Sequence, residues 1–323
     1  MSSRQFAPLR GKLLLLIGTV VLTDNHWIIY FTLGYNCILL NNKCIMYRTY
    51  IFLIVSLQFF LVFVNPLRAQ FFDQNPEILD KGNLVVTYSL LWSEDSLNRD
   101  FQRQEDMYLI LGPSYSQFVS KNLLLGYLQG RAMEKEGKLD HFLNLPADQR
   151  YRARFLYNIY KDYKNSKIIY IGHILPTRFR YDEQMSDIKW ELGIDTSLVL
   201  GYKVYQAFTK YGGREWVIWY STDLPFNDGP YKFCGLPGLI LKAHDKNMDY
   251  VFEAVLIEKL KEDMDIEMSV RDIVITTRQN FLKAEENFKY EIGNRAKEAG
   301  VQTEVQQKAA KNMLKKNNPI ELK

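Results

Sequence analysis

Residues 214–245 read REWVIWYSTDLPFNDGPYKFCGLPGLILKAHD, and this stretch decides the expected fold. Its first part alternates and places Trp216, Ile218 and Tyr220 on one face of a strand, because successive strand side chains point to opposite faces. Residues 239–243 form a second short apolar run after a region rich in turn residues. The stretch therefore predicts two strands joined by a loop and a tight turn.

The connection between these strands has two parts. Residues 223–230 contain prolines, a glycine, an asparagine and aspartates, which are typical of turns and loops. Pro237-Gly238 has the order of a type II turn, since proline fixes φ at the first central position and glycine accepts a positive φ at the second. We therefore expect Gly238 to have a positive φ and Leu239 to leave the turn as the start of a strand.

Strand-like segments recur on both sides of this stretch. They lie at residues 83–92, 107–111, 154–160, 166–174, 196–208 and 250–257. Aromatic residues make up 14% of the chain, and flat rings favour the half-buried surface of a sheet. The pattern predicts a mainly β fold, in which an antiparallel sheet forms either a curved half-barrel or a sandwich.

Two regions depart from the strand pattern. Residues 120–145 combine a leucine-rich run with charged residues, which predicts either a helix or a loose insertion. The C-terminal stretch is rich in Ala, Glu, Lys and Gln, and Phe281 and Phe288 recur there at helical spacing. We expect a β domain over residues 70–278, followed by a helical segment over residues 279–323 that lies on the sheet.

Residues 46–69 have the pattern of a secretory signal. Arg48 supplies the positive charge, an apolar core follows over residues 50–64, and Ala69 fits the last position before a cleavage site. The core is shorter than the roughly 20 residues that span a bilayer. The pattern predicts export to the periplasm or cell envelope. The alternative is an uncleaved anchor, whose membrane contact would be confined to residues 46–64.

A signal of this kind functions at the start of a chain, so residues 1–45 need a separate explanation. We interpret them as an extension produced by a start codon assigned too early, with Met46 as the true start. The alternative is an additional membrane hairpin, because residues 13–21 and 28–40 are apolar.

Charge and histidine spacing argue against several classes of site. The net charge is +4, from 41 basic and 37 acidic residues, which is too balanced to predict nucleic-acid binding. No pair among His141, His173 and His244 has the spacing of two metal ligands on one face. We therefore expect no metal site, no cofactor and no nucleic-acid partner.

Two groups invite a catalytic interpretation. Cys234 would need a neighbouring base to act as a nucleophile, so we expect it to be a buried packing residue. Asp223 and Asp228 resemble an acid–base pair, but an aspartate in such a loop usually bonds the backbone ahead of it. The sequence therefore identifies no catalytic residue.

The turn carries a family resemblance. The hexapeptide Gly235-Leu236-Pro237-Gly238-Leu239-Ile240 resembles the signature of the GLPGLI family. Flanking agreement is found at Gly201-Tyr202, Gly213-Arg214, Trp219-Tyr220, Leu224-Pro225, Gly229-Pro230, Phe233 and residues 317–322. The resemblance runs from about residue 80 to the C-terminus and implies a secreted or envelope-facing protein of undetermined function. Family members often have a cysteine where this chain has Val204, so a role for that cysteine does not transfer.

Aromatic residues in the same stretch are the candidates for binding. They are Trp219, Tyr220, Phe226, Tyr231 and Phe233, the densest aromatic cluster in the chain. An exposed aromatic face marks a ligand or protein contact. The structural motif is expected to comprise Gly229, Pro230 and the six signature residues. We expect a noncatalytic envelope binding module for an apolar ligand or an envelope protein partner; the alternative is an envelope hydrolase or peptidase with an unrecognised site.

Overall fold

The computed structural model describes residues 18–23, 26–31, 72–298 and 316–322. The chain divides into two compact units, residues 1–69 and 70–323. In the first unit, β1 (Gly18–Thr23) and β2 (His26–Phe31) pair in antiparallel fashion. The expected signal lies outside the described residues, so both cleavage and anchoring stay predictions. Within the described residues, no helix has the length and apolar character needed to span a membrane.

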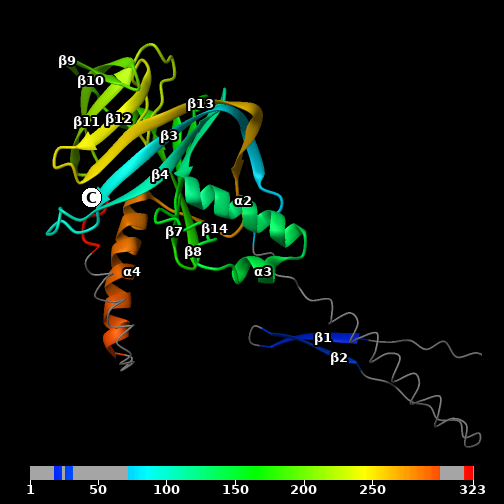
Figure 1. Cartoon of the computed structure of the whole chain (residues 1–323). Coiled ribbons are helices and arrows are strands. Elements are labelled where there is room, and N and C mark those ends of the chain that lie inside the picture. The colour runs from blue at the N-terminus through cyan, green and yellow to red at the C-terminus, as the bar shows by residue number, and fades with distance from the viewer. Residues whose placement is uncertain (1–17, 24–25, 32–71, 299–315, 323) are drawn as a thin grey trace, which may run out of the picture. The chain divides into compact units, whose positions relative to one another are not determined.

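The second unit contains one large open sheet (Figure 1). Its first six strands are β3 (Glu77–Ser93), β4 (Gln102–Leu111), β5 (Tyr115–Ser120), β6 (Asn158–Asp162), β7 (Lys167–Ile174) and β8 (Thr177–Gln184). The other six are β9 (Glu191–Val199), β10 (Tyr202–Tyr211), β11 (Arg214–Ser221), β12 (Leu239–Asp245), β13 (Tyr250–Met268) and β14 (Ile273–Ile275). The strand order is β14-β8-β7-β6-β5-β4-β3-β13-β12-β11-β10-β9.

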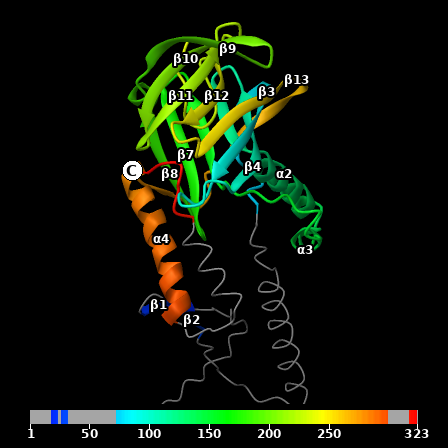
Figure 2. The ribbon, with the colours of Figure 1, turned by 60° about the vertical axis from the view of Figure 1, so that its left-hand side comes forward.

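The predicted mainly β fold is confirmed. Neighbouring strands pair in antiparallel fashion except β14, which pairs with β8 in parallel. Figure 2 shows a single sheet curling around its own interior. The strand order places β9 at one end of the sheet and β14 at the other. The sheet is therefore open, and it is not two sheets packed as a sandwich.

Several strand boundaries differ from the prediction. The segment 196–208 is not one strand, because Leu200 and Gly201 both have positive φ (50° and 81°) and form a two-residue hairpin turn between β9 and β10. The strand expected at residues 154–160 begins only at Asn158. β13 is longer than predicted, since its pairing with β3 continues to Met268. Met264, Ile266 and Met268 alternate with charged residues there, and Ile266 and Met268 are buried.

The helices resolve the alternatives for the remaining segments. Residues 120–145 form α2 (Lys121–Lys135) and α3 (Leu139–Leu143), so the loose insertion is excluded. The Ser120 hydroxyl caps α2 by accepting a hydrogen bond from the Leu123 N–H. A short 3₁₀ helix, η1 (Met185–Asp187), follows β8.

The C-terminal segment is only partly as expected. α4 (Arg278–Glu298) packs against β7 and β8 near its start, where Phe281 is buried, and Figure 1 shows its later turns extending beyond the sheet. Residues 316–322 are not helical. They return to the sheet, where the Leu322 N–H donates to the Gly212 carbonyl at 2.7 Å.

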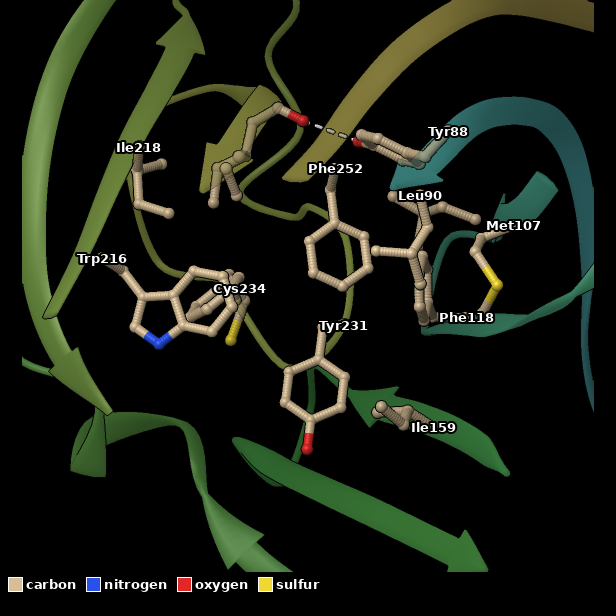
Figure 3. Packing of buried hydrophobic residues seen from close by; sticks show 14 of the residues in the cluster. Tyr88, Leu90, Met107, Phe118, Ile159, Trp216, Ile218, Tyr231, Cys234 and Phe252 are labelled. Atoms are coloured by element: carbon tan, nitrogen blue, oxygen red, sulfur yellow. Dashed lines mark hydrogen bonds between the residues drawn. The ribbon is translucent and has the colours of Figure 1, made fainter. Parts of the chain in front are cut away.

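The main core lies inside the curve of the sheet. Figure 3 shows Trp216, Tyr231 and Phe252 packed together at its centre. The rings of Tyr231 and Phe252 are stacked, with centroids 6.4 Å apart. The Tyr88 hydroxyl donates to the Ile240 carbonyl at 2.6 Å, which links β3 to β12, the strand that begins with the last two residues of the hexapeptide. The signature segment is therefore part of the hydrophobic core.

Candidate functional site

The signature turn is a γ-turn rather than the type II turn that the sequence predicted. The Gly238 N–H donates to the Leu236 carbonyl at 2.8 Å, a bond between residues two apart that closes a three-residue turn around Pro237. Proline fits the central position because its ring fixes φ near the required value. The expected positive φ of Gly238 is confirmed at 151°.

The hexapeptide fastens the preceding loop to the sheet. Three backbone bonds join Gly235 N–H to Asn227 O, Leu239 N–H to Leu224 O, and Ile240 N–H to Asp228 O, at 3.0, 2.9 and 2.9 Å. Leu236, Leu239 and Ile240 are buried, whereas Gly235 and Pro237 are exposed. The geometry accounts for the motif as a structural element.

Asp228 anchors the loop through a buried ion pair. Lys161, fully buried, donates to the Asp228 carboxylate and to the Gly229 carbonyl, the latter at 2.7 Å. Ser116 and Tyr163 donate hydroxyl bonds to the same carboxylate, each at 2.5 Å. A buried charge is tolerated when its partners satisfy it in this way.

The acid–base pair considered for Asp223 and Asp228 is not formed, because Asp223 is exposed while Asp228 is buried and fully bonded. Asp228 also accepts a bond from the backbone N–H of Gly229 at 2.6 Å, as expected for turn chemistry.

A second buried lysine, Lys232, lies in a cage of four tyrosine rings. The ammonium of Lys232 is 4.8–5.5 Å from four tyrosine rings, those of Tyr170, Tyr181, Tyr211 and Tyr231. It forms ion pairs with Glu183 at 2.5 Å and Glu321 at 2.6 Å. Burial alone would raise the pKa of Glu321, but Lys232 and Arg278 outweigh it and hold that pKa below its ordinary value. The sequence showed no sign of this cage, because its members come from distant segments.

Arg214 holds the C-terminal tail in place. Its guanidinium donates to the Asn318 side chain at 2.7 Å and to the Pro319 and Ile320 carbonyls at 2.6 and 3.0 Å. It also pairs with Asp245 at 2.8 Å. The tail is thereby fixed along one side of the groove described below.

The five aromatic candidates do not form one exposed face. Phe233, Tyr231 and Tyr220 are 0%, 2% and 6% exposed and belong to the core. Trp219 and Phe226 are half-buried. The cluster is therefore not one exposed face, because aromatic density in the sequence does not separate core rings from exposed rings. Tyr231 alone reaches the groove.

The groove has a volume of about 390 Å³ and lies between the start of α4, strand β7, the segment 154–157 and the C-terminal tail. Its walls are largely aromatic and include Trp92, Phe155, Tyr157, Tyr170, Tyr250 and Phe281. Charged side chains at the groove are Glu94, Arg154, Glu285, Lys289, Lys316 and Glu321. A concave, mainly apolar site of this size is typical for small ligands, which occupy pockets of about 300–1,000 Å³.

Tyr157 is the unusual residue of the groove. It is 5% exposed, and among the described residues its buried hydroxyl has no hydrogen-bond partner. Its ring packs against Phe155, Tyr170 and Tyr231 at centroid distances of 5.6, 5.6 and 5.8 Å. Burial raises the pKa of Tyr157 well above its ordinary value, so the hydroxyl stays protonated.

In the described part of the chain, neither His173 nor Cys234 is hydrogen-bonded to the Tyr157 hydroxyl. His173 lines the groove, and burial lowers its pKa, so its ring is neutral at neutral pH. Cys234 is buried away from the groove, as expected for a packing residue, and burial raises the pKa of its thiol to about 12. An activated thiol has a lowered pKa. Within the described part of the chain, no group of three or more His, Cys, Asp and Glu side chains is arranged to hold a metal ion.

Comparisons with known proteins give one family match and two distantly similar structures. The model of a family described as "Protein of unknown function (Porph_ging)" matches residues 212–242, which include the hexapeptide. No curated protein matches the chain. The resemblance to the GLPGLI family extends on both sides of this segment, from about residue 80 to the C-terminus, and stays a prediction.

Two crystal structures of PNGF-II, in space groups P21 and C2, are distantly similar. They share 15% and 16% identity, cover 65% and 64% of this chain, and each has a TM-score of 0.45. The matched region is 34% and 33% of the PNGF-II chains, so this chain spans about a third of their length. A likeness at this level supports no statement about function. Over its signature segment, the chain is similar to a family of unknown function.

Proposed function

We propose that the protein is a noncatalytic binding protein of the cell envelope that holds a largely apolar small ligand in the groove. The observation that carries this proposal is the 390 Å³ groove, whose mainly apolar walls include several aromatic rings. Aromatic rings supply a large apolar contact area, which suits a largely apolar ligand. The location rests on the export pattern of residues 46–69.

The chemistry of the charged groups favours binding over the alternative of a hydrolase or peptidase. A general acid needs a pKa raised toward the working pH, but the pKa of Glu321 is lowered and its carboxylate is engaged by Lys232 and Arg278. Burial does raise the pKa of Glu105. That carboxylate accepts bonds from Ser120 and the Arg154 backbone and does not line the groove.

Titration with the fluorescent probe N-phenyl-1-naphthylamine tests the proposal. The wild-type protein should bind the probe saturably, with blue-shifted emission. Phe288 lines the groove from α4, so Phe288→Asp should weaken binding about tenfold by placing a carboxylate against an apolar ligand. The matched control is Ile194→Asp, because Ile194 is 97% exposed on β9 and should leave the affinity unchanged. Equal affinity in the two variants would contradict the proposal.

A specific observation also supports contact with an envelope protein as a second candidate. β9 is a free edge of the sheet, and Leu192, Ile194 and Leu198 are 62%, 97% and 71% exposed along it. An edge strand with exposed apolar side chains can accept an extended segment of another chain as an added strand. A photo-crosslinker at Ile194 should then capture one partner in cells, and capture should be lost when Leu192 and Leu198 are replaced by lysine. Unchanged capture would contradict this candidate.

A further inference from the structure

The carboxylates that line the groove are already paired with cations. Glu94 forms an ion pair with Arg103 at 2.7 Å, and Glu285 lies 3.5 Å from Lys289. Glu321 is held by two cations, as described above. Each of the three carboxylates at the groove therefore has a cationic partner.

Two cations of the groove are less fully paired. Arg154 is exposed, and its guanidinium forms no ion pair among the described residues. The Glu105 carboxylate interacts with the charge of Arg154, but its oxygens accept hydrogen bonds from the Ser120 hydroxyl and the Arg154 backbone N–H. Lys316 lies 4.0 Å from Glu94, a carboxylate that is already paired. The groove therefore carries positive charge that its own carboxylates do not fully neutralise.

These two cations lie near the end of β3. The ring of Phe155, the neighbour of Arg154, packs against Trp92 of β3 with centroids 4.7 Å apart. The Asn318 N–H donates to the carbonyl of Glu94, the residue after β3, at 3.2 Å, which brings the segment that begins at Lys316 to the same place. The groove thus has a cationic end beside β3.

Aromatic rings lead from this end to the opposite wall. Tyr157 packs against both Phe155 and Tyr170, each at a centroid distance of 5.6 Å, and Tyr170 packs against Phe281 at 5.4 Å. Tyr170 lies on β7, which β4, β5 and β6 separate from β3 in the strand order. An apolar wall therefore extends away from the cationic end.

We infer that the ligand is an amphipathic anion, whose apolar body lies along Tyr170 and Phe281 and whose single carboxylate pairs with Arg154 and Lys316. The inference rests on the proposed function, because it assigns the ligand chemistry of the same groove. A guanidinium can bind a carboxylate through two parallel hydrogen bonds, and bonds between ionised groups are stronger than those between neutral groups.

Displacement of bound N-phenyl-1-naphthylamine by decanoate and by 1-decanol tests the inference, because these two compounds have the same chain length and differ in the charge of the head. Arg154→Gln should weaken decanoate binding about tenfold, the effect of losing one charge-assisted hydrogen bond, and leave 1-decanol unchanged. Lys316→Gln should have the same selectivity with a smaller effect. Arg152→Gln is the control, because Arg152 is exposed on the same segment but does not line the groove.

The affinity of Arg154→Gln for the probe itself should equal that of the wild type, which shows that the variant folds. If Arg154→Gln weakens decanoate and 1-decanol equally, or weakens neither, the inference is refuted while the binding function stands. Displacement of the probe by 1-decanol alone would likewise refute the anionic head. If the wild-type protein binds none of the three compounds, both the inference and the proposed function fail.

Discussion

Gly238 lies directly against the backbone of Ser221, so that a Cβ atom added to Gly238 would stand 2.1 Å from the Ser221 carbonyl oxygen. Its φ of 151° is also one that other residues rarely adopt. The signature turn and the end of β11 are thus in backbone contact, which leaves room for glycine alone at this position.

Gly238→Ala should therefore destabilise the protein by about 2–6 kcal/mol, since backbone strain and overpacking each contribute about 1–3 kcal/mol. Urea denaturation measures the loss. Gly137→Ala is the control, because Gly137 has a φ of 75° but nothing within 4 Å of its added Cβ, and it should lose about 1 kcal/mol. Equal losses in the two variants would show that the contact with Ser221 is unimportant.

Lys232 should be critical for stability. Lys232→Met leaves Glu183 and Glu321 without their buried cation, which should cost about 3–5 kcal/mol in chemical denaturation. Lys246→Met breaks an exposed ion pair with Glu215 and should change stability little. If Lys232→Met has the same free energy of unfolding as the wild type, the ion pairs of Lys232 do not contribute to stability.

The pKa of Glu321 predicts a pH dependence of stability. Because the folded-state pKa is lowered, the unfolded state binds more protons, so the contribution of Glu321 is present above its unfolded value of about 4.5 and is lost as pH falls below it. The stability difference between wild type and Glu321→Gln should shrink as the pH is lowered through this range. Exposed Glu286→Gln is the control, and a difference that stays constant with pH would refute the assignment.

Export is the prediction made by the N-terminal sequence. N-terminal sequencing of the envelope fraction should find a mature chain that begins near Gln70, after cleavage at Ala69. Recovery of a cytoplasmic species that begins at Met1 would contradict it, and an envelope species that retains residues 46–64 would favour the uncleaved anchor.

The sequence predicted the sheet because its signals are local. Alternation and turn residues correctly identified most strands, including β11 and β12 around the signature. The hairpin between β9 and β10 was missed because Leu200, a residue not typical of turns, takes one of the two positive φ values. The predicted type II turn was wrong since Pro-Gly also suits a γ-turn, and the choice depends on contacts with β11.

The groove was beyond what sequence patterns indicate. Hydropathy places lysines at the surface, yet Lys161 and Lys232 are fully buried through partners far along the chain. The C-terminal residues 317–322 drew attention only through the family resemblance, and their part in the groove depends on tertiary contacts with Arg214. The sequence pattern predicts that Tyr157 lies in a strand, and no neighbouring residue in the sequence indicates that its hydroxyl is buried without a hydrogen-bond partner.

The location of a bound ligand tests the central claim most directly. Crystals of the protein with 2-acetyl-6-bromonaphthalene allow the bromine to be found by anomalous diffraction. The account predicts one bromine peak in the groove between Tyr170, Tyr250 and Phe281. An empty groove, with bromine found only at the protein surface or not at all, would contradict the claim that this groove is the binding site.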